Sequence, residues 1–217
     1  MKKLIYNKVD KAMVSALKKV EFYGRIIVVN TQSGAQKAVD YLLSQPVLGF
    51  DTETRPAFEK GKHYHCALLQ VSTLTECFLF RLNRIGLCPA IKQLLSDKTV
   101  IKVGLAWNND MLSLRELGPF ESGHFIDLQQ MVSKVGIEDQ SLVKMYANLF
   151  GERISKSERL SNWERPELKE SQKIYAAIDA WACVRIYNEV NRLLATRDYE
   201  LVIQPSDNEC NDETSLS

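Results

Sequence analysis

In VLGFDTETRP, residues 47–56, an apolar run leads directly into two carboxylates. The surrounding apolar residues predict a central strand of a sheet, with Asp51 and Glu53 two positions apart at its end. Side chains alternate along a strand with a period of two, so both carboxylates should share one face. Such a pair repels itself unless a cation neutralises it, and hard divalent cations prefer oxygen ligands.

Two further acidic residues stand in distant segments. Asp110 lies in IKVGLAWNNDMLSL (residues 101–114), in the first turn of a predicted helix, where an acid is stabilising in any case. Asp179 lies in the apolar helical stretch YAAIDAWACV (residues 175–184), where an unpaired charge is unfavourable. Tyr175 precedes it by four residues, so the phenol and the carboxylate share a helix face. The four carboxylates together predict a two-metal site for phosphodiester hydrolysis.

The chemistry of such a site assigns a role to each residue. The two ions, Mg²⁺ or Mn²⁺, would be roughly 3.5–4 Å apart. Asp51 is the expected bridging ligand, Glu53 and Asp179 would complete the metal beside the attacking water, and Asp110 would hold the metal beside the leaving group. The Tyr175 hydroxyl would orient the water for in-line attack.

The composition is that of an ordinary globular chain. Of 217 residues, 45% are apolar and 25% are charged, and the net charge of +1 predicts no global attraction to nucleic acid. Five cysteines without a CxxC pair argue against a zinc cluster or a disulfide framework, and favour a reducing, cytoplasmic compartment. We expect no signal peptide, and no apolar run reaches the length of about 18 residues that a membrane span needs. The sequence has no glycine-rich phosphate loop, and no plausible setting for a serine or cysteine triad.

Hydrophobic periodicity predicts an α/β fold: a mixed β-sheet flanked by helices, followed by a helical C-terminal half. Residues 1–24 are expected to form a basic amphipathic lead segment, residues 25–197 one domain, and residues 204–217 a disordered tail. Residues 152–169 are polar and charged, which predicts an exposed loop. The predicted strands are residues 26–30, 47–51, 65–73, 76–82 and 99–104. The predicted helices are residues 35–43, 88–97, 108–117, 125–136, 139–151 and 167–195.

Three motifs in this order resemble those of the DEDDy 3′–5′ exonucleases of the ribonuclease H-like superfamily. They are FDTET (residues 50–54), GLAWNND (residues 104–110) and YAAID (residues 175–179), the last with the Tyr-x-x-x-Asp spacing of the subclass. SLVKMYANLFG (residues 141–151) and LSNWERPELKESQKIYAAIDAWA (residues 160–182) are similar to the exonuclease domain of the Werner syndrome protein, and ribonuclease D is a more distant relative. The sequence departs from the Werner-type pattern at Asn108 and Asn109, where Glu and Gly are usual.

The resemblance implies that Asp51, Glu53, Asp110 and Asp179 bind two divalent cations and that Tyr175 positions the water. It also implies that Thr52 and Thr54 lie near the terminal nucleotide.

Several other residues are predicted to contact substrate. RPAFEKGKHYHC (residues 55–66) gathers basic and aromatic side chains beside the first motif, and KSERLSNWERPELK (residues 156–169) precedes the third. From these segments and the second motif we select Arg55, Lys62, Trp107, Lys156 and Arg159. The competing interpretations are a solvated loop for the lysines and a core position for Trp107, and Trp163 is expected to anchor its loop. His63 and His65 are not expected to bind zinc, because the sequence offers no partners at useful spacing.

The predicted activity is release of nucleoside 5′-monophosphates from a 3′ end, with DNA favoured over RNA because of the Werner-type likeness. Ribonuclease D-like trimming of RNA is the alternative. A catalytically silent nucleic-acid-binding module is a hypothesis of another class, against which the presence of all four acids and the tyrosine argues. A third hypothesis, compatible with activity, is an interaction subunit with a helicase or polymerase partner in trans.

Overall fold

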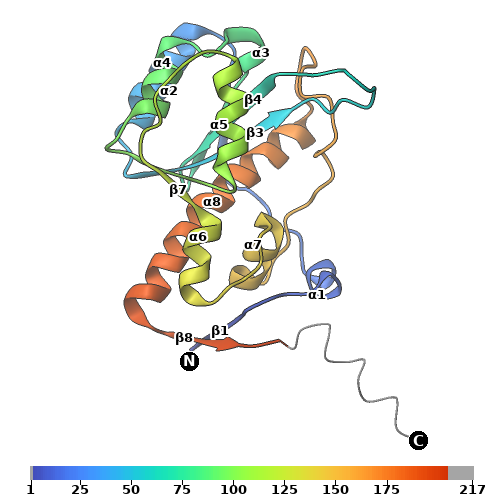
Figure 1. The fold of residues 1–217 in the computed structure, drawn as a ribbon, viewed down its shortest axis with the longest axis vertical. Coiled ribbons are helices and arrows are strands. Elements are labelled where there is room, and N and C mark those ends of the chain that lie inside the picture. Colours follow the sequence, from blue (N-terminus) through green and yellow to red (C-terminus); the bar gives the residue numbers. More distant parts are fainter. Residues whose placement is uncertain (1, 205–217) are drawn as a thin grey trace, which may run out of the picture.

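The computed structural model describes residues 2–204, which form a six-stranded mixed sheet with helices packed on both faces (Figure 1). The strand order is β2-β5-β4-β3-β6-β7, and β4 alone runs antiparallel to both of its neighbours. The strand that carries Asp51 is therefore interior, as predicted. The strands are β2 (Arg25–Val29), β3 (Val47–Thr54), β4 (Cys66–Ser72), β5 (Glu76–Phe80), β6 (Ile101–Gly104) and β7 (Phe125–Asp127).

The helices divide into two groups, one for each face of the sheet. One face is covered by α2 (Gln32–Leu42), α4 (Pro89–Ser96) and α5 (Trp107–Glu116), with the short α3 (Leu82–Ile85) beside them. The other face is covered by the long α8 (Glu170–Thr196), against which α6 (Leu128–Val132), the 3-10 turn η1 (Ser133–Val135) and α7 (Leu142–Phe150) pack.

Strand β3 separates the two groups because its side chains alternate. Leu48 and Phe50 are fully buried in the core beneath α2, α4 and α5. The alternate positions, Gly49, Asp51 and Glu53, face the opposite way, toward α8. The same alternation that builds the core on one face therefore delivers Asp51 and Glu53 to the other.

Gly49 lets β3 and α8 approach at the level of Asp51. A Cβ atom on this glycine would lie 1.9 Å from the carbonyl oxygen of Ala180 and 2.8 Å from Val184 Cγ2. No other residue fits without moving the helix backbone, so the glycine is needed for close approach rather than for a turn. Because Ala180 adjoins Asp179, this contact sets how close the carboxylates of the two elements come.

The N-terminal residues are part of the folded body. Strand β1 (Lys3–Tyr6) pairs in parallel with β8 (Tyr199–Val202), and α1 (Lys11–Ala16) follows it. Ile5 is fully buried in the core beside α8. The folded unit thus extends beyond residues 25–197 in both directions, because the apolar residues between Lys3 and Lys8 of the basic lead segment form a strand that pairs with β8.

The prediction of a single helix over residues 125–136 is wrong at its start. Phe125–Asp127 form β7, paired in parallel with β6, and only then does Asp127 cap the short α6 by accepting a hydrogen bond from the Gln129 amide, 2.9 Å away. The other predicted helices and strands occur with shifts of a few residues. The predicted disordered tail falls almost wholly outside the described residues. Within residues 2–204, no helix is both long enough and apolar enough to cross a membrane.

Candidate active site

Asp51, Glu53 and Asp179 lie together where β3 crosses α8. One carboxylate oxygen from each residue lies within 4.8 Å of one from each of the other two. Glu53 and Asp179 are buried, with 9% and 7% of their surface exposed, and Asp51 is half-buried. These three carboxylates form the acidic cluster of this protein, and they come from segments about 125 residues apart.

Asp110 lies near the acidic cluster, on a helix of the opposite layer, and its charge acts on Asp51. It occupies the first turn of α5, as predicted, and Ala106, in the left-handed conformation with φ +51°, turns the chain from β6 into this helix. The Thr52 hydroxyl, on the side of β3 opposite to Asp51, donates a hydrogen bond to Asp110 Oδ1. The structure therefore brings all four predicted acids to the carboxyl end of β3, from both sides of the strand.

Burial and mutual repulsion raise the pKa values of the carboxylates in and beside the acidic cluster. Burial raises the pKa of Asp51 well above its usual range, and the charges of Asp179 and Asp110 raise it further. Burial, followed by the charges of the neighbouring acids, also raises the pKa of Glu53. Burial raises the pKa of Asp110 to about 6, partly offset by the hydrogen bond from Thr52. Full ionisation of the four groups thus requires a compensating positive charge.

Tyr175 stands beside Asp179 on α8, as the four-residue spacing predicted. Burial and then the charge of Asp179 raise the pKa of the phenol, so it remains protonated at neutral pH. Burial raises the pKa of Asp179 to about 7, against the smaller, opposite effects of Tyr175 and Lys156. The Trp163 ring lies 6.0 Å from the Tyr175 ring, and Trp163 is fully buried. Trp163 therefore anchors its loop, as expected, and also supports the tyrosine.

Residues 152–169 form the predicted loop, and its second half is fixed to the protein body. The buried Arg81 side chain donates to the carbonyl oxygen of Arg165 over 2.6 Å, and Arg84 donates to that of Pro166. From the start of α8, Gln172 Nε2 donates to Ser161 Oγ over 2.8 Å. The sequence did not predict these roles of Arg81, Arg84 and Gln172, because no local pattern identifies a contact with a distant loop.

The first half of this loop carries positive charge toward the acidic cluster. Lys156 lowers the pKa of Asp179 electrostatically, and Arg159 does the same for Glu53, in each case as a minor effect beside burial. Both predicted substrate contacts therefore lie on the acidic cluster's side of the loop.

A second loop, residues 55–65, faces the first (Figure 1). Arg55 Nη1 lies 3.3 Å from Glu164 Oε2, and the Arg55 guanidinium lies 4.6 Å from the centre of the Tyr64 ring. A cleft of about 210 Å³ separates the two loops and includes Arg55, Lys62 and Tyr64 among its lining residues. Arg55 and Lys62 thus lie on a surface that continues from the end of β3.

Two predicted substrate contacts, Trp107 and Thr54, are not among the residues that line this cleft. Trp107 is 5% exposed and packs against Phe50 and Phe125, with ring centres 5.6 and 4.8 Å away. It belongs to the core, the competing interpretation, and its indole packs directly on Gly104, where a Cβ atom would overlap the ring. Thr54 is half-buried at the end of β3, beyond a shift in the β3–β4 register that follows Glu53.

The raised pKa values predict an unusual pH dependence of stability. A carboxyl whose pKa is higher in the folded state binds more protons when folded. The free energy of unfolding therefore falls as pH rises from the unfolded-state pKa through the folded-state pKa. With EDTA present, we expect the melting temperature to decline from pH 5 to pH 7, and Mg²⁺ or Mn²⁺ to restore it more at pH 7. Differential scanning calorimetry checks this. The Asp51→Asn variant should show a flatter profile, and a melting temperature in EDTA that rises over this range would contradict the prediction.

Comparison with known proteins agrees with this geometry. The family model described as 3′–5′ exonuclease matches residues 26–195. The bifunctional 3′–5′ exonuclease/ATP-dependent helicase WRN of Mus musculus is 31% identical over 153 residues, which are 68% of this chain and 11% of that protein. The exonuclease 3′–5′ domain-containing protein 2 of Drosophila melanogaster is 34% identical over 166 residues, which are 75% of this chain and 28% of that protein.

A solved structure matches in fold. The Nibbler exonuclease domain of Aedes aegypti aligns with a TM-score of 0.74 at 20% identity, over 83% of this chain and 95% of that one. The fold is therefore the ribonuclease H-like exonuclease fold, as expected. The chain spans only a small part of the curated relatives named above, so the likeness concerns their exonuclease portion. With the family model covering most of its length, the chain belongs to the 3′–5′ exonuclease family.

Proposed function

We propose that this protein is a metal-dependent 3′–5′ exonuclease that releases nucleoside 5′-monophosphates by a two-metal mechanism. The observation that carries the proposal is the convergence of Asp51, Glu53 and Asp179 within 4.8 Å, with Tyr175 one helical turn before Asp179 on α8. Membership of the 3′–5′ exonuclease family supports the reaction class.

The acidic cluster suits hard divalent cations. It offers only carboxylate oxygens, the ligands that Mg²⁺ and Mn²⁺ favour, and its mutual repulsion is relieved by added positive charge. Asp51, Glu53 and Asp179 would hold one ion, and Asp110, with Asp51 as the bridging ligand, would hold the second. Bound ions would supply Lewis-acid stabilisation of the developing phosphate charge and a lowered pKa for the attacking water.

The protein's own side chains then have separate tasks. The protonated Tyr175 hydroxyl, one helical turn before Asp179, can hydrogen-bond a water and so orient it for in-line attack. Thr52 holds Asp110 in place through its hydrogen bond. Lys156 and Arg159 would bind the scissile phosphate, whose charge is opposite to theirs.

The cleft between residues 55–65 and the loop 152–169 would receive the nucleotides next to the 3′ end. Arg55 and Lys62 supply phosphate contacts there, and Tyr64 supplies a ring on which a base can stack. Since Arg55 already interacts with Glu164, substrate would have to compete for that guanidinium or bind alongside it.

We propose DNA as the preferred substrate, because a WRN protein is among the relatives that exceed 30% identity. A helicase or polymerase partner acting in trans is part of this proposal. We place the protein in a reducing, cytoplasmic compartment, for which the four buried free cysteines among the described residues are suited.

The test is a time course on 5′-labelled DNA and RNA oligonucleotides of matched sequence, with Mg²⁺, Mn²⁺ or EDTA. The expected result is a ladder that shortens from the 3′ end, depends on the cation, and proceeds faster on DNA. Faster shortening of RNA would leave the exonuclease in place and reverse the substrate assignment to ribonuclease D-like trimming. A folded protein that cuts neither substrate would overturn the proposed activity.

Tyr175→Phe should lower kcat by about a hundredfold and leave the affinity for Mn²⁺ nearly unchanged, since the hydroxyl acts on water rather than as a ligand. Single-turnover rates and isothermal titration check the two halves separately. Tyr187→Phe, on the same helix and half-buried, is the matched control and should keep full activity. An equal loss of turnover and metal affinity in Tyr175→Phe would show that the tyrosine is structural.

A further inference from the structure

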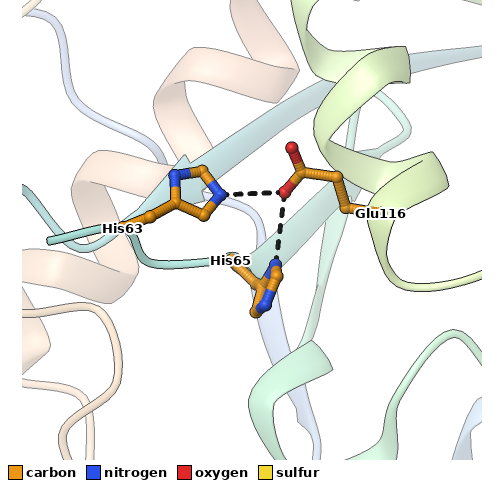
Figure 2. A group of neighbouring side chains, drawn as sticks. All are labelled: His63, His65 and Glu116. Atoms are coloured by element: carbon orange, nitrogen blue, oxygen red, sulfur yellow. Dashed lines mark hydrogen bonds and ion pairs between the residues drawn. The ribbon is translucent and has the colours of Figure 1, made fainter. Parts of the chain in front are cut away.

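A second group of metal-ligating side chains lies outside the acidic cluster. His63 and His65, from the loop after β3, both turn toward Glu116 at the end of α5 (Figure 2). His63 Nε2 lies 3.0 Å and His65 Nδ1 lies 3.2 Å from the same oxygen, Glu116 Oε2. The imidazole planes are nearly perpendicular, at 89°, which lets both nitrogens face one point. Glu116 lies 53 and 51 residues after the two histidines, so sequence spacing does not reveal it as their partner.

The donor set selects the type of cation. Imidazole nitrogen suits zinc and other first-row transition metals, whereas Mg²⁺ favours oxygen alone. Two histidines and one glutamate leave one position of a tetrahedral site for water, and all three side chains are exposed to supply it.

We propose that His63, His65 and Glu116 form a Zn²⁺ site that clamps the loop of residues 55–65 onto α5.

The clamp would fix side chains on both sides of the candidate active site. Tyr64, between the two histidines, lines the cleft and lies against the Arg55 guanidinium, which in turn reaches Glu164 of the opposite loop. At its other end, α5 carries Asp110. Zn²⁺ bound at Glu116 would therefore hold the cleft wall and the helix of the fourth acid in one arrangement.

Zinc titration followed by NMR of the histidine rings tests the site directly, because the chain has three histidines. Zn²⁺ at neutral pH should shift the ring signals of His63 and His65 and leave those of His124 unchanged. Mg²⁺ should shift none of them. Zn²⁺ that also binds the acidic cluster does not obscure this readout, which reports each imidazole separately. Zn²⁺ that shifts no histidine, or all three equally, would overturn the proposal.

Variants assign the third ligand. In Glu116→Gln, the apparent Zn²⁺ affinity obtained from the histidine shifts should fall at least tenfold. Even the loss of a group that only hydrogen-bonds a metal ligand lowers metal affinity by about tenfold or more. Glu121→Gln, which removes an exposed carboxylate from the segment after α5, is the matched control and should titrate like the wild type. Equal affinity in Glu116→Gln and the wild type would sink the proposed three-residue site.

Limited proteolysis tests the clamp. Trypsin cleavage after Lys60 and Lys62, both exposed, should slow at least tenfold when Zn²⁺ is added to the wild type. The same addition should leave the cleavage rate of Glu116→Gln within about twofold of its metal-free value. If the cleavage rate of the wild type were the same with and without Zn²⁺, the loop would not be held by the metal.

Discussion

Asp51→Asn should reduce hydrolysis by roughly 10³-fold or more while the melting temperature stays level or rises. The substitution removes the carboxylate that faces both Glu53 and Asp179, and with it the ligand proposed to bridge two cations. It also removes a charge that burial and the neighbouring acids disfavour, as the raised pKa of Asp51 shows. Activity and stability should therefore move in opposite directions, which a merely misfolded variant cannot do.

The measurement pairs initial rates on a labelled oligonucleotide with calorimetric melting in EDTA. Asp40→Asn provides a matched control, because Asp40 is exposed on α2 and hydrogen-bonds only to Gln36 among the side chains of residues 2–204. It should retain wild-type activity. If Asp51→Asn hydrolysed DNA or RNA at the wild-type rate with Mg²⁺ or Mn²⁺, the acidic cluster would not be the active site.

Gly49→Ala should destabilise the protein by about 3 kcal/mol, a fall of roughly 6–12 °C in melting temperature. The added methyl group would lie 1.9 Å from the Ala180 carbonyl oxygen, which belongs to the backbone of a long helix and cannot turn aside. Relief requires α8 to move away from β3. That movement would also carry Asp179 away from Asp51, so we expect weaker Mn²⁺ binding in the fraction that stays folded.

Thermal melting and isothermal titration with Mn²⁺ test these two consequences. Gly34→Ala is the matched control: its methyl group would meet only the Thr31 hydroxyl, at 3.0 Å, and the Val29 side chain, and alanine favours the helix α2. It should melt at or above the wild-type temperature. A Gly49→Ala protein that melts with the wild type would mean that β3 and α8 can separate freely at this level.

Much of the candidate site followed from local sequence. Alternation along residues 47–54 places Asp51 and Glu53 on one strand face, and helical spacing places Tyr175 beside Asp179, because both periodicities are fixed by the backbone. The glycine inside the apolar strand was a further local signal, since glycine weakens a strand unless another backbone comes close.

Short elements were harder to predict. The three residues of β7 and the four of β1 are too few to establish a period, and FID reads equally well as the first turn of the helix that follows. Their pairing with β6 and β8 supplies the hydrogen bonds that make them strands. In the case of β1, the partner lies almost 200 residues away.

Local sequence was therefore enough to predict the sheet-and-helix pattern, the four acids and the tyrosine, because each depends on neighbours within one strand or helix. How near the acids come depends on the contact of Gly49 with α8, and the loop of residues 152–169 is held by Arg81, Arg84 and Gln172; both are contacts between distant segments. It also decided that Glu116 meets His63 and His65, more than 50 residues earlier. Contacts between distant segments are set by packing of the whole core, and no local period records them.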